Sequence, residues 1–181
     1  MLEYLSDMID IGISSLKVEG RMRSLYYLAT VIGTYREIID RYYDNTLTPE
    51  KMIILEERLS RVANREVSTH YFNKEADETD QYYTGRQEIS NQDYLGQVIS
   101  FDKEEKLIKI YERNYFELGD KLELFTPSGD KITFTLEKLY DDNKNEIDVA
   151  RHPDNIYYVY LDTDIEIPEY SMLRLIEKGM K

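Results

Sequence analysis

The chain of 181 residues is 41% hydrophobic and carries a formal net charge of −13, which predicts one ordinary folded domain or two small ones rather than a disordered chain. Its acidity counts against a nucleic-acid-binding module that works alone, because such modules are usually basic. There is no cysteine, so these residues supply no disulfide, no thiol nucleophile and no thiolate ligand for zinc or an iron–sulfur cluster. No apolar run approaches the length of a membrane span and the N-terminus lacks a signal-peptide pattern, so we expect a cytoplasmic protein with no membrane partner.

The sequence of the first third of the chain predicts one helix, one short strand and then two further helices. Gly12 is a typical helix stop, Ser24 is a suitable N-cap, and Thr48 followed by Pro49 is a typical helix start. In chain order, the hydrophobic spacing predicts a helix over 1–11, a strand over 13–18, a helix over 25–43 and a helix over 49–63. Residues 64–91 are polar and charged and predict a linker.

After residue 93 the spacing of hydrophobic residues changes to that of strands. The predicted strands cover 94–101, 106–112, 121–125, 131–139, 156–162 and 172–176, with a weaker candidate over 147–150. Short strands separated by turns, with no helix between them, predict a small antiparallel barrel or sandwich over residues 92–181. The fold class is therefore α+β.

Tyrosine is abundant, with 17 residues, and several tyrosines fall in one predicted strand. Alternation places Tyr158 and Tyr160 on one face of this strand, and Tyr157, Val159 and Leu161 on the other. One packed face and one wet face explain the pattern without a ligand. Stacking of nucleotide bases on the exposed rings is the alternative.

The segment richest in chemistry joins the predicted strand over 13–18 to the helix that follows. Lys17, Glu19, Arg21 and Arg23 place three cations and one carboxylate around Gly20, where the chain can turn sharply. In parallel α/β architectures ligands bind beyond the carboxyl ends of strands, and a helix N-terminus can hold an anion. The residues alone favour a structural ion pair between Glu19 and Arg21 over a ligand site.

The same segment, Asp10 to Ser24 with Lys17-Val18-Glu19-Gly20-Arg21 at its centre, resembles the collagenase-like peptidases, family number thirty-two of unknown catalytic type. The stretches 63–66 and 94–120 are similar to later parts of this family, so the resemblance covers nearly the whole chain. It implies that residues 1–63 are the closing strand and helices of a truncated catalytic (β/α) barrel, and that residues 92–181 are a C-terminal antiparallel β-barrel domain. We therefore expect a piece of a longer protein that is inactive alone.

What the resemblance implies about function has two parts. The family name implies proteolysis, whereas members of similar sequence are implicated in forming 5-hydroxyuridine at the tRNA wobble position, with prephenate and a cysteine-bound iron–sulfur cluster. By resemblance, Glu19 would be catalytic, and Lys17, Arg21 and Arg23 would bind substrate. The hypotheses are a parent enzyme of tRNA hydroxylation with the β-domain as recognition module, a true peptidase, or a non-enzymatic interaction domain. The expected partners are tRNA and a second copy, the latter through exposed apolar faces of the truncated domain.

Other candidate residues are few. Arg113 and Asn114, ahead of Gly119, are the predicted RNA or partner contact of the β-domain. His70 and His152 are better interpreted as surface or turn histidines than as catalytic groups, and they form no metal-binding spacing. We therefore predict no metal site and no cofactor held by this chain.

Overall fold

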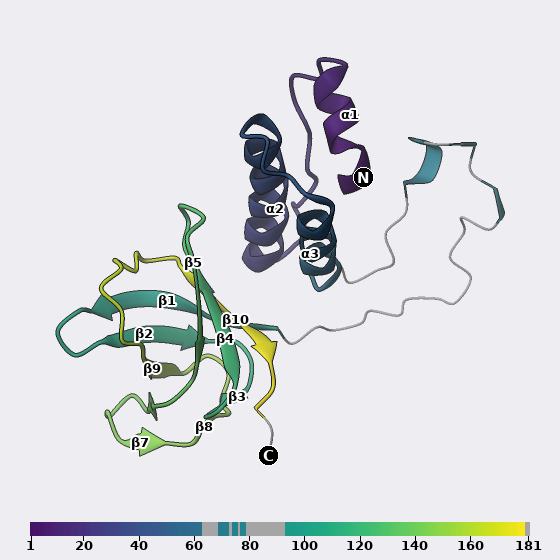
Figure 1. Ribbon diagram of the computed structural model, residues 1–181. Helices are drawn as coiled ribbons and strands as arrows, with labels where there is room; N and C mark the ends of the chain where they lie inside the picture. Colours follow the sequence, from purple (N-terminus) through teal and green to yellow (C-terminus); the bar gives the residue numbers. More distant parts are fainter. Residues whose placement is uncertain (63–68, 73, 76, 79–92, 180–181) are drawn as a thin grey trace. The chain divides into compact units, whose positions relative to one another are not determined.

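The computed structural model describes residues 1–62, 69–72, 74–75, 77–78 and 93–179, and the chain divides into two compact units, Met1–Asn91 and Gln92–Lys181 (Figure 1). The first unit contains helices and the second is an antiparallel sheet, so the α+β prediction is confirmed. Most of the linker predicted over 64–91 lies outside the described residues.

The helical unit is built on three α-helices. Its elements are η1 (Leu2–Tyr4), α1 (Leu5–Asp10), α2 (Leu25–Tyr43), α3 (Pro49–Ser60) and the single turn η2 (His70–Phe72). Leu2, Leu5, Ile38 and Leu55 form its small core, with one or more residues from each of η1, α1, α2 and α3. Within the described ranges, no helix is both long enough and apolar enough to span a membrane.

The end of α1 follows the sequence prediction, but the strand expected after it is not formed. Gly12 adopts φ +83° and donates to the Ile9 carbonyl at 2.9 Å, and the Ile13 N–H donates to the Met8 carbonyl at 3.0 Å. This pair of bonds is a Schellman motif. Residues 13–18 then run on without regular structure, and the prediction of a strand there is wrong. The physical reason is that a strand needs a neighbour, and the helical unit offers none among its described residues.

Both predicted N-caps are confirmed. The Ser24 hydroxyl accepts the Tyr27 N–H at 3.1 Å at the start of α2, and the Thr48 hydroxyl accepts the Lys51 N–H at 3.3 Å at the start of α3. Each bond satisfies one of the N–H groups that a helix start leaves without a partner. Helix α3 ends at Ser60, a little before the predicted end.

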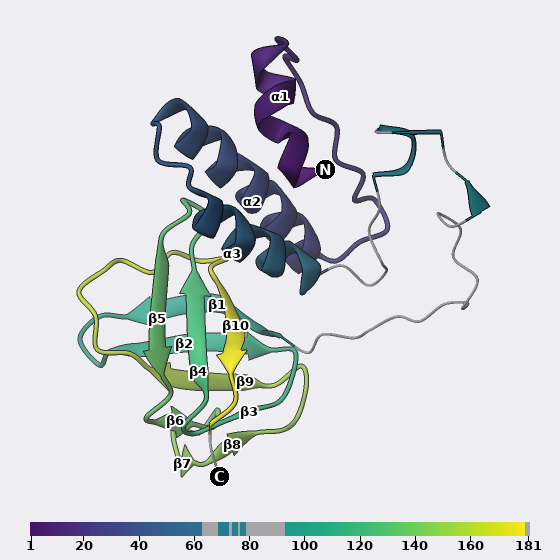
Figure 2. The ribbon, with the colours of Figure 1, turned by 45° about the vertical axis from the view of Figure 1, so that its right-hand side comes forward.

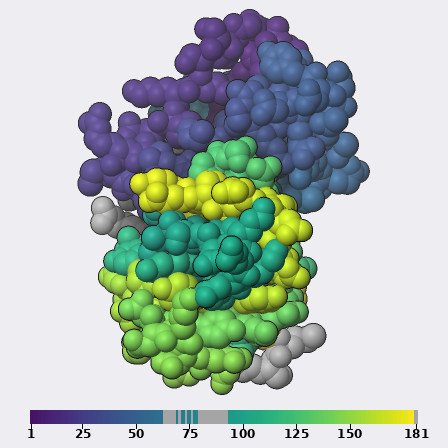
Figure 3. Space-filling model, turned by 90° about the vertical axis from the view of Figure 1, so that its left-hand side faces the viewer, coloured from purple at the N-terminus to yellow at the C-terminus, as the bar shows by residue number. Residues whose placement is uncertain are grey.

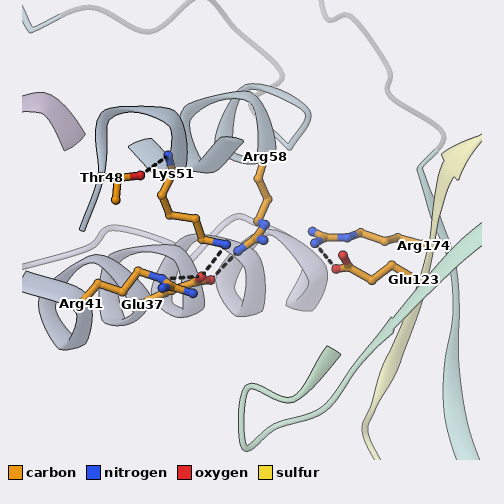
Figure 4. Close-up of polar contacts among 7 residues, drawn as sticks. All are labelled: Glu37, Arg41, Thr48, Lys51, Arg58, Glu123 and Arg174. Carbon is orange, nitrogen blue, oxygen red and sulfur yellow. Dashed lines mark hydrogen bonds and ion pairs between the residues drawn. The ribbon is translucent and has the colours of Figure 1, made fainter. Parts of the chain in front are cut away.

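A single carboxylate joins α2 to α3 (Figure 4). Glu37 lies 3.0 Å from Arg41 on its own helix, and 3.2 Å from Lys51 and 2.8 Å from Arg58 on α3. Its side chain is only 15% exposed. These three cations contact one carboxylate at a partly buried position. The network therefore stabilises the packing of the two helices more than an exposed ion pair would.

The second unit is an eight-stranded antiparallel sheet that curls into a half-barrel (Figure 2). The strand order is β5-β4-β10-β1-β2-β9-β6-β7, and a separate small sheet pairs β3 with β8. The strands are β1 (Tyr94–Asp102), β2 (Leu107–Glu112), β3 (Phe116–Glu117), β4 (Lys121–Phe125), β5 (Lys131–Thr135), β6 (Leu139–Tyr140), β7 (Glu146–Ile147), β8 (Val149–Ala150), β9 (Ile156–Tyr160) and β10 (Met172–Glu177).

The first and last strands of this unit lie side by side. β1 pairs with β10 on one edge and with β2 on the other, so the teal and yellow surfaces are neighbours in Figure 3. Gly96 on β1 lies so close to β2 that a Cβ atom there would stand 2.6 Å from the Tyr111 carbonyl oxygen. A larger residue at this position would push the two strands apart.

The core of the half-barrel follows the alternation that the sequence predicts. On β9, Tyr157 and Val159 are buried and Tyr158 and Tyr160 are partly exposed, with Leu161 buried just beyond the strand. The inward residues pack with others from the remaining strands around Phe116, which is fully buried. The prediction of one packed and one wet face is confirmed.

Three parts of the strand prediction differ from the structure. The weaker candidate over 147–150 forms two strands in different sheets, because β7 pairs with β6 and β8 pairs with β3. Residues 131–139 form two strands, because the chain leaves β4 after β5, and β6 pairs with β9 instead. Leu136 makes this crossing by exchanging backbone hydrogen bonds with Gly119 and Asp120, each of 2.9 Å. The sequence also gives no sign of β3, whose two residues are too few for a periodic pattern.

Two polar contacts in the sheet join residues that are far apart in the sequence. Arg174 on β10 forms an almost fully buried ion pair with Glu123 on β4, and its guanidinium lies 5.0 Å from the centre of the Phe125 ring (Figure 4). Asp120, fully buried, accepts the Glu117 N–H at 3.0 Å, the Gly179 N–H at 3.0 Å and the Lys178 ammonium at 2.8 Å. Asp120 thus ties the chain end after β10 to the turn before β4.

One buried carboxyl group has no such partners. Glu112 follows Ile108 and Ile110 on the inward face of β2, and neither of its oxygens has a hydrogen bond of normal geometry among the described residues. Burial raises the pKa of Glu112 to about 7, and the backbone N–H of His152 only partly opposes this shift. Below about pH 7, the folded protein therefore holds Glu112 mostly in its neutral form.

Replacing Asp120 by Asn should destabilise the β-unit by about 2–4 kcal/mol, because Lys178 loses its counter-charge and one buried acceptor becomes a donor. Urea unfolding followed by tyrosine fluorescence measures this change. Asp142→Asn at an exposed turn position is the matched control and should change stability by less than about 0.5 kcal/mol. Equal stability of the two variants would show that the Asp120 contacts do not hold the chain end.

Replacing Glu112 by Gln should make stability less dependent on pH. Because the pKa of Glu112 is raised in the folded state, its stabilising effect is complete below about pH 4.5 and is lost as the pH rises through about 7. At pH 8 we expect the free energy of unfolding of Glu112→Gln, measured with urea, to exceed that of the original protein by about 1–3 kcal/mol. This difference should shrink near pH 5. Glu177→Gln, at the exposed last position of β10, is the control and should change stability by less than about 0.5 kcal/mol at both pH values. A constant difference for Glu112→Gln would contradict the interpretation.

Candidate functional site

The predicted site residues of the helical unit lie on one exposed segment between the end of α1 and the start of α2. Lys17, Glu19, Arg21 and Arg23 are all exposed. Glu19 accepts a hydrogen bond from the backbone N–H of Arg21 at 2.9 Å, and no ion pair joins these two side chains in the described structure. The structural ion pair that the sequence favoured is therefore absent, and the carboxylate instead stabilises a tight turn.

The cations of this segment remain available to a ligand. The Arg23 guanidinium lies 5.2 Å from the centre of the Tyr27 ring, and neither Lys17 nor Arg21 is bound to a carboxylate within the described ranges. Gly20 lies close to α2, because a Cβ there would stand 2.0 Å from the Leu28 side chain, which would have to shift. The segment is an open cationic loop with one carboxylate, and its role in catalysis stays a prediction.

The two residues predicted as contacts of the β-unit have different environments. Asn114 donates from its side chain to the Tyr94 carbonyl at 2.7 Å, so it holds the chain after β2 against β1. Arg113 points to the surface, where it pairs with Asp154 at 2.9 Å and lies 4.6 Å from the centre of the Tyr111 ring. Of the two, Arg113 has the position that a ligand contact requires, and this role also stays a prediction.

A wide, open groove lies beside Arg113. Its volume is about 520 Å³, and it is lined by Asp141, Asp142, Asn143, Ile147, Val149, Arg151, His152, Asp154, Asn155, Ile156 and Tyr157. His152 is exposed on its turn, as the sequence predicts. Within the described parts of the chain, no group of three or more histidines and carboxylates is arranged to hold a metal ion.

Sequence reasoning missed how charged and aromatic side chains meet on the wet face of the sheet. Lys109 on β2 lies 5.7 Å from the centre of the Tyr158 ring, and Lys138, just before β6, lies 5.0 Å from that of Tyr160. The tyrosines were visible as an alternating pattern, but their lysine neighbours are 20 to 50 positions away in the sequence. Only the pairing of β2, β9 and β6 brings these residues together.

Comparison with known proteins gives matches along almost the entire chain. The model of peptidase family U32 matches residues 1–82, and the model of the peptidase family U32 C-terminal domain matches residues 90–174. The tRNA hydroxylation protein P1 of Bacillus subtilis is 36% identical over 91% of this chain, and a collagenase of Porphyromonas gingivalis is 26% identical over 76%. The chain spans 39% and 38% of the lengths of these two relatives.

Among solved structures, the C-terminal domain of a protein assigned to the U32 peptidases of Geobacillus thermoleovorans is 31% identical. The match covers 48% of this chain and 94% of that domain, with a TM-score of 0.43. The two family models and the relative in Bacillus subtilis match both units, and they confirm the family resemblance expected from the segment around Glu19. The chain belongs to peptidase family U32 and carries the C-terminal domain of that family.

Proposed function

We propose that the protein to which this chain belongs acts in tRNA hydroxylation, forming 5-hydroxyuridine at the wobble position, and that the β-unit recognises the RNA substrate. The observation that carries this proposal is the 36% identity to the tRNA hydroxylation protein P1, which extends over 91% of the chain and so includes both units. A similarity that spans the candidate loop and the half-barrel supports a shared role more strongly than a match to one motif would.

The residues of the helical unit supply an anion-binding loop in this proposal. Arg21 and Arg23 would pair with RNA phosphates or with the carboxylates of prephenate, since a guanidinium can bind such groups with two parallel hydrogen bonds. Glu19 would move a proton or orient the substrate from the same loop. An iron–sulfur cluster does not fit this chain, because the chain has no cysteine to hold it, so no chemical step is assigned to one.

A peptidase is the second candidate, favoured by the similarity to a collagenase at 26% identity. That similarity is lower and covers less of the chain than the match to the tRNA hydroxylation protein P1. The exposed His152 forms no side-chain hydrogen bond with a serine in the described structure, so no nucleophile–base pair supports this reading. Full-length protein that cleaves denatured collagen or casein would favour the peptidase.

Deletion of the gene, in a strain without a redundant relative, should abolish 5-hydroxyuridine in tRNA. Mass spectrometry of nucleosides from purified tRNA measures the modification, and the intact gene should restore it. Glu19→Gln should lower the restored level by about tenfold or more, if the carboxylate moves a proton. Arg21→Ala and Arg23→Ala should each lower it several-fold.

The matched control is Arg36→Ala, because Arg36 is exposed on α2 and only pairs with Asp40 one turn away. This variant should restore the modification fully. Unchanged 5-hydroxyuridine after deletion would overturn the proposed function. If the Glu19 and arginine variants restore the modification fully, the loop has no role in the site, but the proposed function still stands.

A further inference from the structure

The wet face of β2, β9 and β6 has an ordered arrangement of tyrosines and lysines. Lys109 stands directly across from Tyr158, and Tyr158 stands directly across from Tyr140. Lys138 is next to Tyr160, whose N–H donates to the Lys138 carbonyl at 3.2 Å. We call Lys109, Lys138, Tyr140, Tyr158 and Tyr160 the tyrosine–lysine face.

The two lysines of this face are held only by aromatic rings. Lys109 lies over Tyr158 and Lys138 over Tyr160, and neither makes an ion pair or hydrogen bond with a carboxylate among the described residues. The cations at the margins differ. Lys144 also lies 5.7 Å from the centre of the Tyr158 ring, but it pairs with Glu105, and Arg113 pairs with Asp154. Two positive charges at the centre of the face are therefore without a counter-charge in a chain of net charge −13.

We propose that the tyrosine–lysine face binds single-stranded RNA, with Tyr158 and Tyr160 stacking on bases and Lys109 and Lys138 pairing with phosphates. This inference rests on the proposed function, and it assigns the RNA-recognising role to one surface of the β-unit. The recognised chemistry is that of unpaired nucleotides, which expose a flat base next to an anionic backbone.

The spacing of the rings favours a single strand over a duplex. Tyr158 and Tyr160 are two positions apart on β9, which separates them by about 7 Å along the strand. Successive bases of one strand in a B-DNA duplex rise by only about 3.4 Å, half of this distance, and an RNA duplex likewise keeps its bases stacked. The two rings therefore suit neighbouring bases that have separated from each other, as in a loop, and not a continuous stack.

The lysines can leave the rings when RNA binds. An ammonium over an exposed ring is weakly held, and the flexible lysine side chain lets it swing towards a phosphate. This movement uncovers the Tyr160 ring for a base. At Tyr158 it leaves Lys144, which Glu105 holds, as a second cation 5.7 Å from the ring centre. The strongly negative chain repels RNA at long range, so binding through this face should be moderate, sensitive to salt and dependent on the stacking contacts.

Fluorescence anisotropy of the 181-residue chain with a fluorescein-labelled, uridine-rich RNA of about 16 nucleotides tests the proposal, at about 50 mM and 200 mM salt. Tyr158→Leu and Tyr160→Leu keep an apolar, strand-compatible side chain and remove the ring. Each should weaken binding about fivefold or more, whereas Tyr158→Phe should bind as the original chain does. Lys109→Glu and Lys138→Glu should weaken binding and each reduce the slope of log affinity against log salt by about 1.

Matched controls are Lys121→Glu on β4 and Tyr43→Ala on α2, which change an exposed lysine and an exposed tyrosine outside the face. Both should bind within about twofold of the original chain, and circular dichroism should show every variant folded. A duplex of the same sequence should bind more weakly than the single strand.

Three results would overturn the proposal. The first is that the original chain does not bind the RNA at low salt. The second is that the folded face variants bind as tightly as the controls, and the third is that the face binds an acidic peptide in preference to RNA. These results are separate from the test of the proposed function. If gene deletion abolishes 5-hydroxyuridine but the face variants bind RNA normally, only the proposal for the tyrosine–lysine face is rejected. If the face binds RNA but gene deletion leaves 5-hydroxyuridine unchanged, only the proposed function is rejected.

Discussion

The half-barrel depends on the buried carboxylate of Asp120. Its two oxygens accept hydrogen bonds from Glu117, Lys178 and Gly179, while its backbone binds Leu136. These partners come from three separate parts of the chain. The carboxylate joins the turn before β4 to the chain after β10, and the backbone carbonyl of the same residue holds Leu136 at the crossing between β5 and β6. Without these contacts the sheet would keep the hydrogen bonds between its strands but lose the link between the end of β10 and the turn before β4.

Local features of the chain were the most predictable. Gly12, Ser24 and Thr48 mark the helix ends, because each meets a need of the backbone within four residues. The strand over 13–18 failed for the opposite reason, since its pattern is local but its hydrogen bonds need a distant partner. The same limit explains why residues 131–139 read as one strand, although the chain changes neighbours near Leu136.

Site residues show the same division between local pattern and tertiary contact. The loop from Lys17 to Arg23 could be found from its run of charges, and its family could be recognised from the same run. The pairing of Lys109 with Tyr158 could not, because it depends on the register between β2 and β9. Asn114, predicted as a contact residue, donates a hydrogen bond to the backbone of β1, and the sequence pattern gave no indication of this bond. Burial of Glu112 was equally invisible, because a charged residue in an alternating strand is normally assigned to the wet face.

The open half-barrel also has to avoid joining other sheets. β5 stands at one end of the strand order, so one side of its backbone has no strand neighbour in the described structure. Such an edge can template the addition of a strand from another chain. Lys131, Thr133 and Thr135 are exposed on this strand, whereas Ile132 and Phe134 turn towards the core. A short edge with a charge and two hydroxyls is poorly suited to pairing with a copy of itself, so this edge of the open half-barrel disfavours edge-to-edge association.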